Sequence, residues 1–275
     1  MSSIYRVLFV GDVVGRVGRR VLAVGLPDLV REHSPLFVIV NGENSAAGVG
    51  ITPAIAEEFF ELGVDAITLG NHAFKKREIY PYLDGPWPIV RPANMAPGVP
   101  GRGSALLDKA GVRLLVANLC GRVYMDAYDD PFRAVDLVLA EAEGAHAVVD
   151  FHAEATSEKV AMAYYLDGRA TAVLGTHTHV TTADERVLPG GTAAITDVGM
   201  TGPVGGVLGM DRDIVLRRFL SGLPERFEVS DKPGVISGVV IDVVKDTGRA
   251  KAIRRVSNAE PGAETWVSAS EDGQR

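Results

Sequence analysis

The stretch Tyr5-Arg6-Val7-Leu8-Phe9-Val10-Gly11-Asp12 decides the fold class of this chain. Its β-branched and aromatic residues predict a buried strand, and Gly11-Asp12 predicts a loop that begins where the strand ends. The same pattern, an apolar strand followed at once by polar residues, recurs further along the chain. The recurrences are 36–40 followed by Asn41-Gly42-Glu43-Asn44, 66–69 followed by Gly70-Asn71-His72, 147–149 followed by Asp150-Phe151-His152, and 172–174 followed by Gly175-Thr176-His177-Thr178-His179.

Helical patterns lie between these strands, and the alternation of strand, polar loop and helix predicts α/β architecture. The expected helices are 18–32, 53–62 with Thr52 as its N-cap, 131–142 and 157–166. In the second half we expect antiparallel strands at 186–196, 227–230, 235–244 and 250–256, and a short helix at 213–222. A single domain over residues 1–258 accommodates this pattern, and the small, polar residues 259–275 predict a C-terminal tail.

Composition narrows the class of protein. With 28 Lys and Arg against 35 Asp and Glu, the net charge of −7 disfavours a large nucleic-acid-binding surface. The hydrophobic fraction of 47% is typical of a globular protein with a sizeable core. The one cysteine, Cys120, rules out an internal disulfide and favours a cytoplasmic location, and we expect it to pack as a small apolar residue. No apolar stretch is long enough to predict a signal peptide or a membrane span.

Polar side chains at five strand ends form a candidate metal site. Ligands of open α/β sheets bind at the carboxyl ends of the strands, so residues gathered there are expected to share one site. Their mixture of oxygen donors and imidazoles suits manganese, iron or zinc. We expect the two-residue period of an extended chain to direct His177 and His179 to the same side. The candidate residues are Asp12, Glu43, Asn44, Asn71, His72, His152, His177 and His179.

Taken singly, several of these residues also have a purely structural interpretation. Asp12 can be a turn or capping aspartate, Asn71-His72 a turn with a surface histidine, and His152 part of a solvated polar cluster. Four of the six histidines lie at these strand ends, and a single shared site explains this distribution better than separate structural roles.

The order of these motifs carries a resemblance to a known superfamily. Asp12, Gly70-Asn71-His72 and Gly175-Thr176-His177-Thr178-His179 resemble, in this order, the signature of the calcineurin-like metallophosphoesterases. Longer blocks resemble the YmdB-like branch of that superfamily, namely 11–15, 41–44, 150–159, the His-x-His block and 196–203.

Two departures from the general superfamily pattern point to the same branch. Val14 stands where the usual histidine would be, and Glu43-Asn44 replaces the usual bridging aspartate. The YmdB-like branch makes the same replacements, which implies that Asn44 supplies the ligand that the missing histidine would have given.

The resemblance implies a fold, a metal site and a reaction. The fold would be a four-layer α/β/β/α sandwich with mixed sheets, and the cofactors would be two metal ions, iron or manganese. A hydroxide that bridges the metals would attack the phosphorus, and His72 would protonate the leaving alkoxide as general acid. One metal would be held by Asp12, Glu43, Asn44 and His179, and the other by Glu43, Asn71, His152 and His177, with Glu43 bridging them.

The implied substrates are small nucleotide phosphodiesters, in particular 2′,3′-cyclic nucleotides. A phosphomonoesterase, a nuclease acting on short RNA and a non-catalytic metal-binding regulatory protein stay open as alternatives. A homo-oligomer is the usual state of such an enzyme.

Other motifs favour structural roles. The glycine-rich segments 48–50 and 201–206 favour turns over anion-binding nests. Arg16, Arg19 and Arg20 favour a solvated helix face over a phosphate contact. The spacings of the P-loop and of the dinucleotide fingerprint are absent from the sequence.

Overall fold

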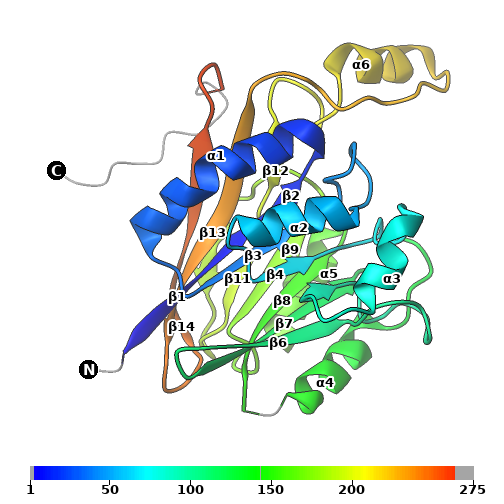
Figure 1. Ribbon diagram of the computed structural model, residues 1–275. Coiled ribbons are helices and arrows are strands. Elements are labelled where there is room, and N and C mark those ends of the chain that lie inside the picture. Colours follow the sequence, from blue (N-terminus) through cyan, green and yellow to red (C-terminus); the bar gives the residue numbers. More distant parts are fainter. Residues whose placement is uncertain (1–2, 143, 264–275) are drawn as a thin grey trace.

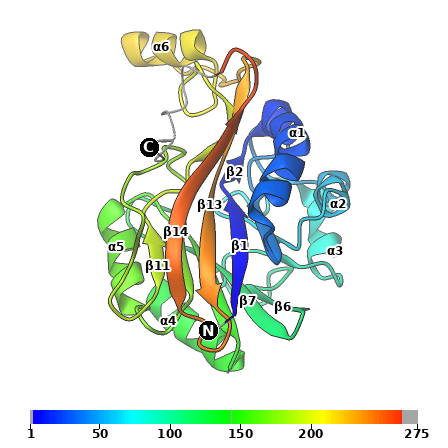
Figure 2. The ribbon, with the colours of Figure 1, turned by 90° about the vertical axis from the view of Figure 1, so that its left-hand side faces the viewer.

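The computed structural model describes residues 3–142 and 144–263, which form the predicted four layers of helices, sheet, sheet and helices (Figures 1 and 2). One outer layer contains α1 (Gly15–His33), α2 (Pro53–Glu61) and α3 (Tyr80–Leu83), with the 3-10 turn Arg77–Ile79 before α3. The other contains α4 (Pro131–Glu141) and α5 (Thr156–Tyr165). Among the described residues, no helix combines the length and the apolar character that a bilayer span requires.

The first sheet has the N-terminal strand near its centre. Its strands are β1 (Ile4–Val10), β2 (Asp12–Val13), β3 (Phe37–Asn41), β4 (Ala66–Thr68), β5 (Ile89–Val90), β12 (Met200–Pro203), β13 (Gly234–Val244) and β14 (Ala250–Ala259). They follow the order β2-β12-β13-β1-β3-β4-β5, with β14 on β13. Because β1, β3 and β4 are parallel, their carboxyl ends lie at one edge.

The second sheet contributes the remaining strand ends. Its strands are β6 (Ser104–Lys109), β7 (Val112–Cys120), β8 (His146–His152), β9 (Ala172–Thr176), β10 (Arg186–Val187) and β11 (Ala193–Ile195). They follow the order β10-β11-β9-β8-β7-β6, in which β7, β8 and β9 are parallel. The five predicted strand ends therefore come from two facing sheets rather than from one.

Alternation along β1 explains how the layers pack. Val7 and Phe9 face the second sheet and share a buried cluster with Val148 of β8, whereas Leu8 and Val10 face the outer layer of α1 and α2. A third cluster fills the space between the second sheet and α4 and α5. Three apolar layers thus stabilise the sandwich, and the polar site residues lie at the strand ends.

The predicted helices are confirmed to within three residues at each end, and Thr52 caps α2 by accepting a 3.3 Å hydrogen bond from the Ile55 amide. The antiparallel hairpin of β13 and β14 is also confirmed. Three expectations for the second half are wrong. Residues 186–196 form two short strands joined by a turn, β11 pairs with β9 in parallel, and 227–230 is no strand, although Val229 bridges to Met210.

The hairpin of β6 and β7 was not predicted from the sequence. The strand β7 ends at Cys120 and lacks the polar strand end by which the other strands were predicted.

Two features lie at the margins of the sandwich. Helix α6 (Arg212–Ser221) projects from the body (Figures 1 and 2) and ends at Gly222, whose φ of 70° suits a glycine cap. The predicted tail begins inside β14, and the Glu260 carboxylate accepts a 2.9 Å hydrogen bond from the Gly234 amide. Residues 264–275 of that tail lie outside the described residues.

Candidate active site

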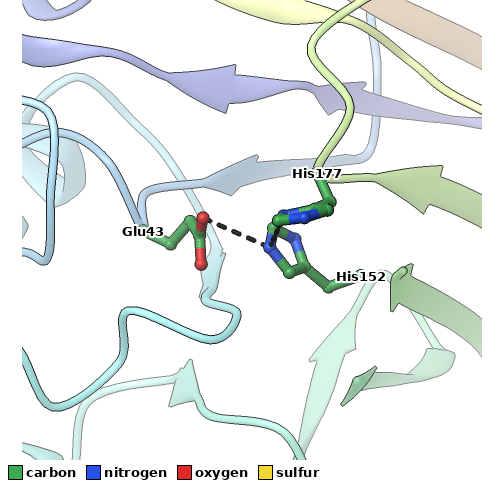
Figure 3. Close-up of side chains that lie close together, drawn as sticks. All are labelled: Glu43, His152 and His177. Atoms are coloured by element: carbon green, nitrogen blue, oxygen red, sulfur yellow. Dashed lines mark hydrogen bonds and ion pairs between the residues drawn. The ribbon is translucent and has the colours of Figure 1, made fainter. Parts of the chain in front are cut away.

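The strand ends of both sheets bring the predicted site residues together. Figure 3 shows Glu43, which follows β3, facing His152 at the end of β8 and His177 just after β9. One donor atom from each of these three residues lies within 4.8 Å of the others. Glu43 and His152 are fully buried, while 22% of the His177 side chain is exposed.

Three potential metal-ligating atoms lie close to the Nε2 atom of His152. It lies 3.0 Å from Asn71 Oδ1, 3.0 Å from His177 Nδ1 and 3.2 Å from Glu43 Oε1. A ring nitrogen offers either one proton or one lone pair, so it cannot satisfy three such neighbours by hydrogen bonding. Convergent oxygen and imidazole donors are what a transition-metal cation requires.

A second group of donors adjoins the first. Asn44 Nδ2 lies 3.1 Å from His179 Nε2 and 3.0 Å from Glu43 Oε1. Asp12, in the two-residue strand β2, is fully buried, and its Oδ2 accepts a 3.2 Å hydrogen bond from the His177 amide. Glu43 therefore contacts members of both groups.

His72 lies beside the donors with one quarter of its side chain exposed. Its Nδ1 is 2.7 Å from Asn44 Oδ1 and 3.4 Å from Glu43 Oε1, and its backbone amide donates a 3.2 Å hydrogen bond to Glu43 Oε2. The Nδ1 contacts fix the ring and leave Nε2 free of these neighbours.

The backbone of the His-x-His block differs from the expectation. Strand β9 ends at Thr176, and the next residues form a turn in which His177 and His179 have φ values of 96° and 64°. The predicted extended alternation is wrong, since the left-handed region is what directs both rings to the site. Left-handed conformations cost about 1–3 kcal/mol at residues other than glycine and persist only where contacts hold them.

A buried network supports His152 from behind. Thr176 Oγ1 donates a 2.6 Å hydrogen bond to Asp150 Oδ1 and lies 2.8 Å from His152 Nδ1. Because the hydroxyl proton points to Asp150, the hydroxyl oxygen accepts the proton of His152 Nδ1, and Nε2 faces the donor group. Full burial of Asp150 and His152 also excludes a solvated polar cluster.

The pKa values reflect these contacts. Burial raises the pKa of Glu43, but its contacts with His152 and His72 outweigh burial and lower the pKa well below its usual range. Burial lowers the pKa of His152, but Glu43 outweighs this effect and raises the pKa to about 9. Burial and the neighbouring His152 lower the pKa of His177 to about 3. A proton and a cation therefore compete for the same nitrogen of His152.

Two further observations test whether the residues fit a metal. The buried Oδ1 atom of Asp12 accepts no hydrogen bond from any described residue, so a carboxylate oxygen is left for another partner. A Cβ atom at Gly70 would collide with the Glu43 carboxylate and the His152 ring, so this glycine keeps the space between them open. Both observations, together with the donor types, fit metal ions.

Several residues that support the site were not predicted from the sequence. Asn41, Thr176 and Glu154 lie within the strand-end motifs and bind candidate ligands; Glu154 Oε2, for example, lies 3.1 Å from His177 Nε2. Asp150, in the same motifs, binds Asn41 and Thr176. Their positions next to predicted ligands were the available signal, because partners of metal ligands commonly lie close to them.

The remaining sequence motifs have structural roles. Gly48 and Gly50 have positive φ and build the turn that holds the Asn44 carbonyl, whereas 201–203 belongs to β12 and is neither turn nor nest. Arg19 and Arg20 form ion pairs with Glu58 and Glu260, and Arg16 is exposed. Cys120 is buried at the end of β7, and burial raises the pKa of its thiol well above the usual range.

The two helix-covered mixed sheets, with oxygen and imidazole donors gathered at their strand ends, define a phosphoesterase of the calcineurin-like class. Residues 8–256 match the family model described as YmdB-like protein, and the chain belongs to this family.

Three relatives illustrate the match. A curated protein of Bacillus subtilis, named 2′,3′-cyclic-nucleotide 2′-phosphodiesterase, is 49% identical over 91% of this chain and 96% of its own length. A Thermus thermophilus crystal structure has a TM-score of 0.88 and 45% identity over 93% of this chain and 100% of that chain. A structure described as a novel phosphatase of Mycoplasma pneumoniae has a TM-score of 0.90 and 33% identity over 96% of this chain and 98% of that chain.

Proposed function

We propose that this chain hydrolyses small nucleotide phosphodiesters, in particular 2′,3′-cyclic nucleotides, in a site that holds two metal ions, iron or manganese. The observation that carries the proposal is the crowding of His152 Nε2 by Asn71, Glu43 and His177, which hydrogen bonding cannot satisfy. The name of the Bacillus subtilis relative supports the substrate class.

The ligand assignment follows the two donor groups. Asp12, Asn44 and His179 would hold one cation, and Asn71, His152 and His177 the other, with Glu43 shared. The contact of Asn44 with His179 and the contacts of His152 with Asn71 and His177 support this partition. Two bound cations would supply a nucleophilic water near neutral pH and neutralise charge on the phosphate. A shared carboxylate offsets the repulsion between two neighbouring cations.

His72 is proposed as the general acid. Its Nδ1 is held by Asn44 Oδ1 at 2.7 Å, and its partly exposed ring leaves Nε2 able to meet a substrate oxygen. When the bond between phosphorus and the 2′-oxygen breaks and a bond to the oxygen of water forms, His72 Nε2 would give its proton to the departing 2′-oxygen. The product is then the 3′-monophosphate.

Hydrolysis of 2′,3′-cyclic AMP by the purified full chain tests the proposal. The protein is assayed as isolated, after chelation and after Mn²⁺ or Fe²⁺ is restored, with Glu43→Gln as the metal-site control. We expect ring opening to 3′-AMP that is lost on chelation and recovered with metal. Absence of turnover in the metal-loaded protein would refute the substrate assignment.

Phosphomonoester hydrolysis is a second candidate, because the Mycoplasma pneumoniae relative is described as a phosphatase. The same assay with 3′-AMP and a short RNA oligonucleotide separates these reactions. Release of inorganic phosphate would favour the monoesterase, whereas cleavage of the oligonucleotide would favour the nuclease. The cytoplasmic location and a homo-oligomeric state stay predictions.

A further inference from the structure

A buried ion pair lies close to the candidate site but outside its donor set. Lys159 Nζ, in the first turn of α5, is 2.8 Å from Asp197 Oδ2, which follows β11, and only 3% and 1% of the two side chains are exposed. The blocks 150–159 and 196–203 of the sequence contain these residues, yet the proposed chemistry uses neither. Removing two charges from water is costly, so such a pair needs further partners.

The Asp197 carboxylate finds its other partners in the His-x-His turn. Its Oδ2 accepts hydrogen bonds from the Thr178 hydroxyl at 2.6 Å and from the Thr178 amide at 3.1 Å. Its Oδ1 accepts a 2.7 Å hydrogen bond from the Gly199 amide. Thr178 is therefore bound through both its backbone and its side chain.

The turn needs such an anchor because both of its histidines are left-handed. His177 and His179 have φ values of 96° and 64°, a region that residues with a side chain rarely adopt. Strand pairing gives no help there, since β9 ends at Thr176. Thr178 is the residue between them, so a fixed Thr178 constrains the backbone on either side.

Lys159 reaches the carboxylate from the outer helical layer. Its aliphatic chain passes Gly175, where an added Cβ would lie 3.0 Å from Lys159 Cδ. An added Cβ would also lie 1.8 Å from the Thr196 carbonyl oxygen, so a glycine at position 175 admits the backbone before Asp197 as well as the lysine. The Lys159 ammonium group compensates the buried Asp197 carboxylate.

We propose that Lys159 and Asp197 are positioning residues that hold the His177–His179 turn in its left-handed conformation. The part of the proposal that concerns metal affinity rests on the proposed function. The part that concerns the turn itself does not, because the contacts exist in the polypeptide alone.

Three variants test the proposal in the full chain. Asp197→Asn removes the carboxylate charge, Lys159→Met removes its cation, and Thr178→Val removes one hydroxyl while leaving the ion pair intact. Thr192→Val is the matched control, because it also removes one buried threonine hydroxyl, which lies 2.6 and 3.1 Å from the carbonyl oxygens of Ala170 and Leu166, away from the His-x-His turn. Amide hydrogen exchange of residues 176–180 is measured with chelator present, and Mn²⁺ affinity is measured by calorimetry.

We expect faster exchange at residues 176–180 in Asp197→Asn and Lys159→Met, a smaller effect in Thr178→Val and none in Thr192→Val. Mn²⁺ affinity should fall about 10- to 100-fold in the first two variants, as is typical for partners of metal ligands. If residues 176–180 exchanged at the wild-type rate in folded Asp197→Asn and Lys159→Met, the proposal would be overturned, whatever the thermal stability of these variants. If the wild-type protein bound no Mn²⁺ but its residues 176–180 exchanged slowly, the proposed function would be refuted, whereas the positioning role of Lys159 and Asp197 would stand.

Discussion

Asn41 Nδ2 donates a 2.9 Å hydrogen bond to Asp150 Oδ2, and this bond connects the two sheets beneath the candidate site. Asn41 ends β3 of the first sheet, Asp150 lies in β8 of the second, and both are fully buried. Asn41 Oδ1 also accepts a 3.1 Å hydrogen bond from the Glu43 amide. Asp150 reaches His152 through Thr176, so one bond couples the supports of two proposed ligands.

Asn41→Leu should therefore lower the free energy of unfolding. It leaves the Glu43 amide and one Asp150 oxygen without these partners, and each buried unpaired group costs about 1–3 kcal/mol. Urea unfolding followed by circular dichroism measures the change. Ser221→Ala, which removes the exposed bond from Ser221 Oγ to the Arg217 carbonyl, serves as control and should change stability by less than about 0.5 kcal/mol. Equal stability of Asn41→Leu and wild type would contradict the coupling.

His72→Ala and Glu43→Ala should separate proton transfer from metal binding. His72→Ala is expected to retain its metal content and to lose about 10²- to 10⁴-fold in kcat, the usual contribution of a general acid. Glu43→Ala is expected to lose both metal and turnover, because Glu43 lies between the two donor groups. Elemental analysis and steady-state kinetics measure the two quantities. Full activity in His72→Ala would remove the general-acid assignment.

Mn²⁺ should raise the midpoint of thermal unfolding of the chelator-treated protein. A ligand that binds only the folded state at 100 times its Kd stabilises that state by about 2.7 kcal/mol. Differential scanning calorimetry at increasing Mn²⁺ concentration measures the shift, and Glu43→Gln should respond much less. An equal response in both proteins would show that Mn²⁺ binds elsewhere.

Asp242 should contribute to the pH dependence of stability. Burial raises its pKa, but hydrogen bonds from Arg254 and Arg6 outweigh burial and lower the pKa below the usual value of 3.8. Because the folded state holds the proton less tightly than the unfolded state, the stabilisation is present above pH 3.8 and is lost as the pH falls through the lowered pKa. Asp242→Asn should thus be less stable than wild type at pH 7 by about 1 kcal/mol. The difference should vanish in acid, and a constant difference across this range would exclude the ion pairs as its cause.

Much of the fold could be predicted because local sequence patterns indicate most of its strands and helices. The buried strands β1, β3, β4, β8 and β9 each end in polar residues, and this combination predicted the composition of the site as well. The hairpin of β6 and β7 carries no such ending, and the parallel pairing of β11 with β9 depends on contacts between distant residues.

The conformation of the His-x-His block illustrates the limit of sequence patterns. The spacing of two predicted that both rings share a side, which they do, but through left-handed backbone at His177 and His179. Asp197, which accepts a hydrogen bond from Thr178 between them, lies outside the motif. Backbone strain of this kind is decided by tertiary contacts and leaves no periodic signal. The hydrogen bond between Asn41 and Asp150 could not be predicted for the same reason, since the two residues lie on different sheets.

A substitution at Gly70 offers a way to block the catalytic site in a cell that still makes the protein. Gly70 follows β4, and a single methyl group there would occupy the space between Glu43 and His152 without altering the charge of any residue. A strain that carries Gly70→Ala would keep every exposed side chain of the protein while the space between Glu43 and His152 is filled. Phenotypes that persist in such a strain belong to the protein as a binding partner, and those that disappear belong to its turnover.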